Sequence, residues 1–140
     1  MIWRKLNATF GKLENRTLVL EEGLNFIHAP NESGKSTWCA FLRTMLYGFP
    51  ARSRGALADK NRYAPWSGSP MQGSMEIEQD GQRLTISRRT ARAKSPMGAF
   101  SAAYTDTATP VEGLTAANCG EVLLGIPREV FERSAFIRQA

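Results

Sequence analysis

The sequence predicts an α/β fold, in which a mixed sheet with an antiparallel β-hairpin packs against one long helix. Three observations predict it. A short apolar run at residues 24–27 leads into a loop, an amphipathic helix follows that loop, and two alternating segments flank Asp80-Gly81. The 140 residues are enough for a domain with a hydrophobic core. Residues 1–140 are therefore expected to form one unit.

The N-terminal part of the chain is expected to be extended. Apolar residues are spaced among polar ones in residues 1–10 and 17–20, which predicts two strands, and residues 21–23 predict a turn. The run at 24–27 predicts a buried strand that enters the loop.

The helix after the loop is predicted from Ser36 onward by the three–four spacing of its apolar residues. Gly48 marks its C-terminal stop and Pro50 follows. The apolar stripe predicts core packing against the sheet rather than ligand contacts. It consists of Trp38, Phe41, Leu42, Met45, Leu46 and Phe49.

The middle of the chain predicts a surface loop followed by strands. Residues 51–70 are rich in Arg, Gly, Ser and Pro, without a helical stripe. Residues 73–79 and 82–89 flank the Asp80-Gly81 turn and predict a hairpin, and residues 100–104 predict a further strand.

The C-terminal part predicts two short helices, at residues 115–124 and 127–131. Thr115 is the candidate N-cap of the first, and Pro127 fits the first position of the second. Residues 136–139 predict the beginning of another strand.

The loop carries the most specific motif of the chain, of the form [Gly/Ala]-x-x-x-x-Gly-Lys-[Ser/Thr] between a strand and a helix. Successive backbone N–H groups and the positive end of the following helix form an anion site, which suits a triphosphate. The motif therefore predicts binding of ATP with Mg²⁺. Its residues are Ala29, Pro30, Asn31, Glu32, Ser33, Gly34, Lys35, Ser36 and Thr37.

Each residue type in the second half of the motif has a distinct chemical role. Gly34 allows the phosphates to approach the backbone closely. Lys35 supplies a cation for the β- and γ-phosphates, and the Ser36 hydroxyl is placed to ligate Mg²⁺. Thr37 is expected to donate a hydrogen bond to the α-phosphate. Lys35 is accordingly the candidate catalytic residue of this segment.

A second requirement of ATP hydrolysis is missing from the sequence. Such enzymes hold magnesium with an acidic residue at the end of another apolar strand. No apolar run ending in Asp or Asp-Glu follows the loop. We therefore expect the chain to bind a triphosphate but not to hydrolyse it alone, which makes it an ATPase half-site.

Composition excludes several other classes of protein. No apolar run approaches membrane-spanning length, and the N-terminus lacks a signal pattern. Cys39 and Cys119 are too far apart in sequence to indicate a metal site or a disulfide framework, so a reducing cytoplasm is expected. The lone histidine, His28, adjoins the loop, where a structural role is favoured. The net charge of +5 permits contact with nucleic acid without establishing it.

Two further segments leave alternatives open. The two aromatics of Arg62-Tyr63-Ala64-Pro65-Trp66 fit stacking on a base, contact with a partner protein, or attachment of the loop to the domain. The densest basic cluster fits either phosphate backbones of DNA or, with greater weight, a solvated strand end. It consists of Arg88, Arg89, Arg92 and Lys94.

The chain resembles the N-terminal half of an SMC-like, ABC-type ATPase head, and within that group it looks closest to the bacterial YhaN-type AAA domain. The resemblance covers nearly the whole chain. It is carried by four stretches: Thr9-Phe10-Gly11-Lys12, residues 22–37, Arg62-Tyr63-x-Pro65-Trp66, and residues 130–139.

The resemblance implies further site residues and partners. Gln139 matches the Q-loop glutamine, which touches Mg²⁺ and the attacking water, so it is expected to be catalytic and metal-binding. The basic residue that the family places after the first strand falls on Gly11 here, so neighbouring Lys12 takes that role. The family's signature motif, Asp-Glu strand and switch histidine belong to a C-terminal lobe beyond a coiled coil, and none is present. A homodimeric partner head, DNA and a nuclease are the other partners implied.

Three functions are consistent with the motif and the resemblance. The first is an ATP-binding lobe of an SMC-like ATPase in DNA repair or chromosome maintenance, driven by head dimerisation. The second is a nucleotide-gated interaction module without hydrolysis. The third, a small phosphotransferase, is weakest because no lid-like arginine pattern is visible. An exposed apolar surface is also expected where the missing lobe would dock.

Overall fold

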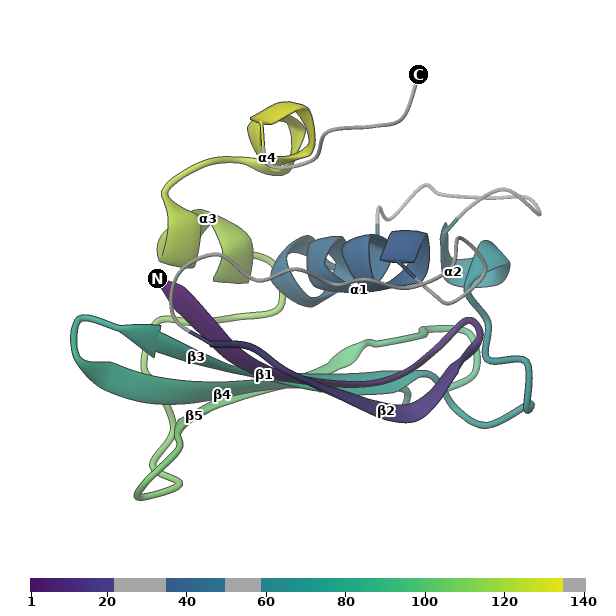
Figure 1. Cartoon of the computed structure of the whole chain (residues 1–140), viewed down its shortest axis with the longest axis horizontal. Helices are drawn as coiled ribbons and strands as arrows, with labels where there is room; N and C mark the ends of the chain where they lie inside the picture. The colour runs from purple at the N-terminus through teal and green to yellow at the C-terminus, as the bar shows by residue number, and fades with distance from the viewer. Residues whose placement is uncertain (22–34, 50–58, 135–140) are drawn as a thin grey trace.

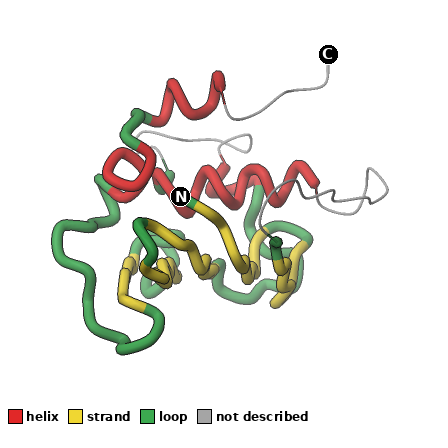
Figure 2. Tube along the Cα trace, turned by 60° about the vertical axis from the view of Figure 1, so that its left-hand side comes forward, coloured by secondary structure: helices red, strands yellow, loops and turns green. Residues whose placement is uncertain are grey.

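The computed structural model describes residues 1–21, 35–49 and 59–134. These residues form two layers, with a five-stranded sheet on one side and the helices on the other (Figures 1 and 2). The elements in chain order are β1 (Ile2–Phe10), β2 (Leu13–Val19), α1 (Lys35–Tyr47), α2 (Asp59–Arg62), β3 (Gln72–Gln79), β4 (Gln82–Arg89), β5 (Ala99–Tyr104), α3 (Cys119–Leu124) and α4 (Arg128–Ser134).

The sheet has the order β2-β1-β3-β4-β5, and every pairing among the described strands is antiparallel. The prediction of a mixed sheet is therefore wrong for this part of the chain. The strand predicted at 24–27 lies outside the described residues. The β3–β4 hairpin confirms the turn prediction, because Asp80 and Gly81 both have positive φ, 51° and 77°. Two successive positive φ values define the type I′ turn that matches the twist of a two-residue hairpin.

The core lies between the sheet and α1. Strand residues that alternate along β1, β3 and β4 point toward the helix and are buried, among them Phe10, Met75 and Ile86. Phe41, Met45 and Leu46 of α1 are completely buried against them, which confirms the predicted stripe. A Cβ atom on Gly73 of β3 would overlap the ring of Phe41, so glycine lets the helix approach the sheet closely.

The opposite face of the sheet is polar. Lys5 and Asn7 of β1 pair with Glu76 and Ser74 of β3, and the helices all lie on the other side (Figure 1). One covered and one solvated face is typical of antiparallel sheets. The expected apolar docking surface is therefore absent from this face of the described sheet. Among the described residues, the exposed large apolar side chains belong to separate segments of the chain and are Met1, Val19, Trp66, Val122 and Val130.

The other predicted elements form with shifted boundaries. The strand expected at 17–20 begins already at Leu13, and the expected loop after residue 58 contains the one-turn helix α2. The first C-terminal helix begins at Cys119 rather than near Thr115. Thr115 and Asn118 instead hydrogen-bond each other across the preceding turn, Thr115 N to Asn118 Oδ1 at 2.7 Å and Asn118 N to Thr115 Oγ1 at 3.2 Å.

The second C-terminal helix, α4, starts at Arg128, one residue after its predicted position. Pro127 directly precedes it, and the carbonyl of Pro127 accepts the bond from Phe131 N at 3.1 Å. The segment predicted at 136–139 lies outside the described residues.

Candidate functional site

Helix α1 begins at Lys35, one residue before the start predicted from the sequence and within the loop motif. Its first turn contains no acidic residue, so no side chain of its own offsets the positive end of the helix dipole. Its 13 residues all align their peptide dipoles with that end. The preceding motif residues Pro30, Asn31, Glu32, Ser33 and Gly34 lie outside the described residues, as does the side chain of Lys35.

Ser36 and Thr37 differ in how they are presented at this end of α1. Ser36 is exposed, whereas Thr37 is only 7% exposed. The Thr37 methyl group points toward the β1–β2 turn, where a Cβ built on Gly11 would lie 3.2 Å from Thr37 Cγ2. Ser36 therefore has the accessible hydroxyl that a magnesium ligand requires, and Thr37 joins the helix to the turn.

The β1–β2 turn (Gly11 and Lys12) lies at the same end of the molecule as the start of α1 (Figure 1). Gly11 has a φ of 57°, and a Cβ there would also lie 3.3 Å from the Tyr63 ring. A larger residue would combine a strained backbone with close contacts on two sides. The structure thus explains why glycine occupies this position, and it leaves Lys12 as the basic residue of the turn.

The segment 63–66 is fastened to that turn. Gly11 N donates to Tyr63 O at 2.7 Å, and Trp66 N donates to Gly11 O at 3.1 Å. The Tyr63 ring stacks on Phe10, with 5.0 Å between centroids and 18° between planes. The two aromatics of this segment therefore have different environments: Tyr63 attaches the segment to the core, while Trp66 is 80% exposed.

The other end of α1 is held by Arg88 of β4. Its Nε donates to Met45 O at 2.9 Å, and its guanidinium also reaches Leu46 O at 3.5 Å and Ala116 O at 3.0 Å. Met45 and Leu46 carry two of the last carbonyls of α1, which have no partner within the helix. A cation at this end also stabilises the helix dipole.

Arg88 therefore does not belong to an exposed basic cluster. It is 2% exposed and lies over the Phe100 ring, 4.9 Å from the ring centroid. The alternation along β4 predicts the burial of Arg88, because Arg88 follows Leu84 and Ile86 on the buried face of the strand. Arg89, Arg92 and Lys94 are exposed and remain candidates for contact with an anionic partner.

Arg88 also contacts Cys119 of α3, and the two groups affect each other's protonation. Burial lowers the pKa of Arg88, and burial raises the pKa of the Cys119 thiol, against the opposing influence of Arg88. Both changes favour the neutral form. They reflect the low solvent access of the region where β4, α1 and α3 meet.

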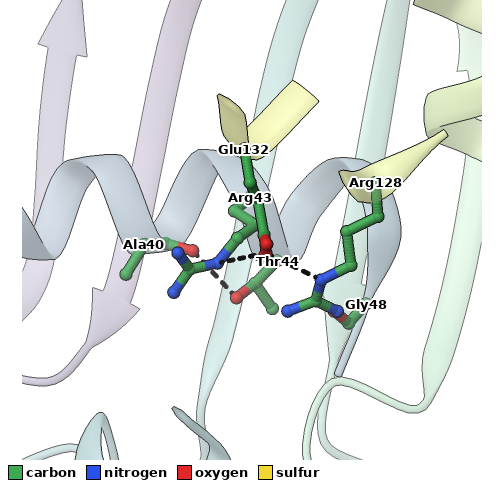
Figure 3. A network of polar contacts seen from close by, with 6 residues as sticks. All are labelled: Ala40, Arg43, Thr44, Gly48, Arg128 and Glu132. Carbon is green, nitrogen blue, oxygen red and sulfur yellow. Dashed lines mark hydrogen bonds and ion pairs between the residues drawn. The ribbon is translucent and has the colours of Figure 1, made fainter. Parts of the chain in front are cut away.

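A second arginine reaches the end of α1 from α4 (Figure 3). Arg128 donates from a terminal nitrogen to Gly48 O at 2.9 Å and from Nε to Glu132 at 3.0 Å. Glu132 lies 3.6 Å from Arg43 of α1. These contacts tie α4 to α1. Gln139, the predicted Q-loop residue, lies outside the described residues.

A groove of about 370 Å³ lies between the segments 60–71 and 90–96. Prolines and alanines form much of its wall, including Pro65, Pro70 and Pro96. It shares no residue with the predicted nucleotide site. Among the described residues, no group of His, Cys, Asp and Glu side chains could hold a metal ion, and no helix has the length and apolar character to span a membrane.

The arrangement is chemically compatible with a magnesium–nucleotide complex. The residues that the structure describes place a positive helix end, an accessible serine hydroxyl and a basic turn at one end of the molecule. Magnesium supplies charge neutralisation of the phosphates, and Ser36 would be its ligand from this chain.

A comparison with curated proteins gives no match. A comparison with protein-family models gives a match that spans nearly all of the sequence: the model of the AAA domain matches residues 1–137. That match indicates a nucleotide-binding, ATPase-like domain, in agreement with the loop motif. The chain belongs to the AAA domain family.

Proposed function

We propose that the chain is the ATP-binding N-terminal lobe of an SMC-like, YhaN-type ATPase that acts in DNA repair or chromosome maintenance. The observation that carries this proposal is the phosphate-binding motif, which leads directly into the N-terminus of α1 in a chain that matches the AAA domain. In this proposal Lys35 neutralises the β- and γ-phosphates and Ser36 ligates Mg²⁺. Lys12 supplies a further cation from the neighbouring turn.

The way α1 is held supports this role. A helix that presents amide groups to a phosphate must be fixed along its axis, because the dipole effect falls off within one turn. Arg88 and Arg128 bind carbonyls at the far end of α1, and Thr37 at the near end is buried beside Gly11 of the β1–β2 turn. Both ends of the helix are thus attached to other elements before any ligand is bound.

Turnover is proposed to need a second lobe. The described residues offer no acidic cluster beside Ser36, and the sequence has no apolar strand that ends in Asp-Glu. A C-terminal lobe would supply that strand, and a second head would supply the signature motif. Gln139 would then contact Mg²⁺ and the attacking water as the Q-loop glutamine.

The test is titration of the chain with a fluorescent ATP analogue in the presence of Mg²⁺. We expect weak, magnesium-dependent binding and negligible hydrolysis, with binding lost in Lys35→Ala and its magnesium dependence reduced in Ser36→Ala. Arg133→Ala, an exposed cation on the distant α4, is the matched control. Equal affinity of Lys35→Ala and the unchanged chain would reject the nucleotide site.

A second step separates this proposal from a nucleotide-gated module without hydrolysis. Adding a chain with the signature and Asp-Glu motifs restores turnover if the proposal holds. If ATP drives association but turnover stays absent, the gated module is the better description.

Contact with DNA is assigned to the exposed cations at the end of β4 and in the segment after it. Arg89, Arg92 and Lys94 are exposed beside the groove, and none has a neighbouring acidic residue in sequence. Replacing all three with alanine is expected to weaken binding of labelled duplex DNA and to reduce the salt dependence of that binding. Unchanged affinity and salt slope would remove DNA from this surface.

A further inference from the structure

Trp66 is held in solvent by a segment that is hydrogen-bonded to the β1–β2 turn. It is 80% exposed, the most exposed of the large apolar side chains among the described residues. Burying an aromatic side chain removes about 150–250 Å² from water, so this position forgoes a large hydrophobic gain. Tryptophan side chains are enriched at interfaces, so an indole held in solvent in this way is available to contact a ligand.

The backbone around Trp66 is fixed rather than loose. Its N–H binds Gly11 O at 3.1 Å, and Pro65 restricts the preceding residue. Tyr63, three residues earlier, is stacked on Phe10 and accepts a hydrogen bond from Gly11 N. The indole is thereby presented from a rigid support, which lowers the entropy lost when a ligand stacks on it.

The support also has a defined location. Gly11 is hydrogen-bonded to Tyr63 and lies beside Thr37 in the first turn of α1, where a Cβ on Gly11 would come within 3.2 Å of Thr37 Cγ2. The segment 63–66, the β1–β2 turn and the start of α1 therefore form one contiguous corner of the molecule, and α2 lies at the same end in Figure 1. The phosphates of a nucleotide bound at α1 would leave its ribose and base to extend over this neighbouring surface.

We propose that Trp66 stacks on the base of the bound nucleotide. This inference rests on the proposed function, because it assumes that the phosphates bind at the N-terminus of α1. Tyr63 is the positioning residue that fixes the segment, and Trp66 is the residue that touches the ligand. Stacking on an indole face is tolerant of base identity, so the subsite accepts nucleoside triphosphates with different bases.

The experiment compares two ligands that share phosphates but differ in the base. Mg-ATP and magnesium inorganic triphosphate are titrated into the unchanged chain, Trp66→Ala, Trp66→Phe and Lys35→Ala, to concentrations well above the Kd of the unchanged chain. Trp66→Ala is expected to weaken ATP binding about tenfold and to leave triphosphate binding unchanged, because stacking acts only on the base. Trp66→Phe retains most of the ATP affinity.

Two controls separate stacking from other effects. Val122→Ala removes an exposed apolar side chain on α3, at the other end of α1, and should change neither affinity. Since Trp66 is exposed, Trp66→Ala should also leave the thermal unfolding midpoint unchanged. ATP, but not triphosphate, should quench a component of indole fluorescence that is missing in Trp66→Phe.

The outcomes distinguish the two proposals. If Lys35→Ala abolishes binding of both ligands while Trp66→Ala binds ATP normally, the nucleotide site stands and base stacking is overturned. An equal loss for ATP and triphosphate in Trp66→Ala also overturns stacking, since it indicates a distorted corner. If the unchanged chain binds neither ligand, the proposed function fails first and this inference fails with it.

Discussion

Replacing Arg88 with methionine tests how the end of α1 is held. Methionine keeps much of the unbranched side chain but removes the guanidinium that binds Met45 O at 2.9 Å and Ala116 O at 3.0 Å. Both acceptors lie where Arg88 itself is buried, so water does not readily replace the lost donor. Each buried carbonyl left without a partner costs about 1–3 kcal/mol.

The net effect is smaller than the sum of these costs. Removing Arg88 also removes a cation whose burial is unfavourable, as the lowering of its pKa indicates. Losing the contact with the Phe100 ring, in contrast, destabilises the variant by about 0.5–2 kcal/mol. We therefore expect Arg88→Met to lower the free energy of unfolding by about 2–4 kcal/mol.

The assay is urea unfolding of the 140-residue chain followed by circular dichroism. Arg89→Met is the matched control, because Arg89 follows directly in β4 but is exposed, and its replacement should change stability by less than about 0.5 kcal/mol. Arg88→Lys should fall between the two, since an ammonium lacks the planar fork that reaches separate carbonyls. Equal stabilities of Arg88→Met and Arg89→Met would refute the assignment of Arg88 as the anchor of α1.

Two further predictions concern the sheet. Gly73→Ala places a methyl group against the Phe41 ring and should lower the free energy of unfolding in urea by about 1–3 kcal/mol. Gln72→Ala, at the neighbouring exposed position, should have little effect. Equal free energies of unfolding for the two variants would contradict the close approach of α1 to β3. The hydrogen bond from Arg4, 2.8 Å long, lowers the pKa of Glu78 from its ordinary value of 4.5. A carboxylate with a lowered pKa stabilises the fold above its unfolded pKa, and this contribution is lost as pH falls. Glu78→Gln should therefore reduce stability near neutral pH, and the difference from the unchanged chain should shrink below pH 4.5; a constant difference across that range would refute the ion pair.

Local patterns predicted the elements well where one interaction dominates. The Asp80-Gly81 turn and the apolar stripe of α1 were both correctly placed, because backbone conformation and burial leave few alternatives there. The start of β2 was missed. Its residues from Leu13 are mostly polar and are ordered by pairing with β1 rather than by burial of their own.

The site was predictable only in part, for a related reason. The motif predicts Lys35, Ser36 and Thr37 as site residues from sequence alone, and the structure adds that Thr37 is buried beside the β1–β2 turn. No local pattern distinguishes Tyr63 from Trp66, because their different exposure depends on Phe10 and Gly11, more than fifty residues earlier in the chain. Charge alone groups Arg88 with its basic neighbours, whereas the alternation of residues along β4 places it on the buried face.

NMR of the backbone amides of Ser36 and Thr37 during addition of Mg-ATP tests whether the nucleotide binds at the start of α1. If it does, these signals and that of Lys12 shift in a saturable way, and the shifts disappear in Lys35→Ala. Shifts confined to the groove between segments 60–71 and 90–96, with the start of α1 unaffected, would contradict it.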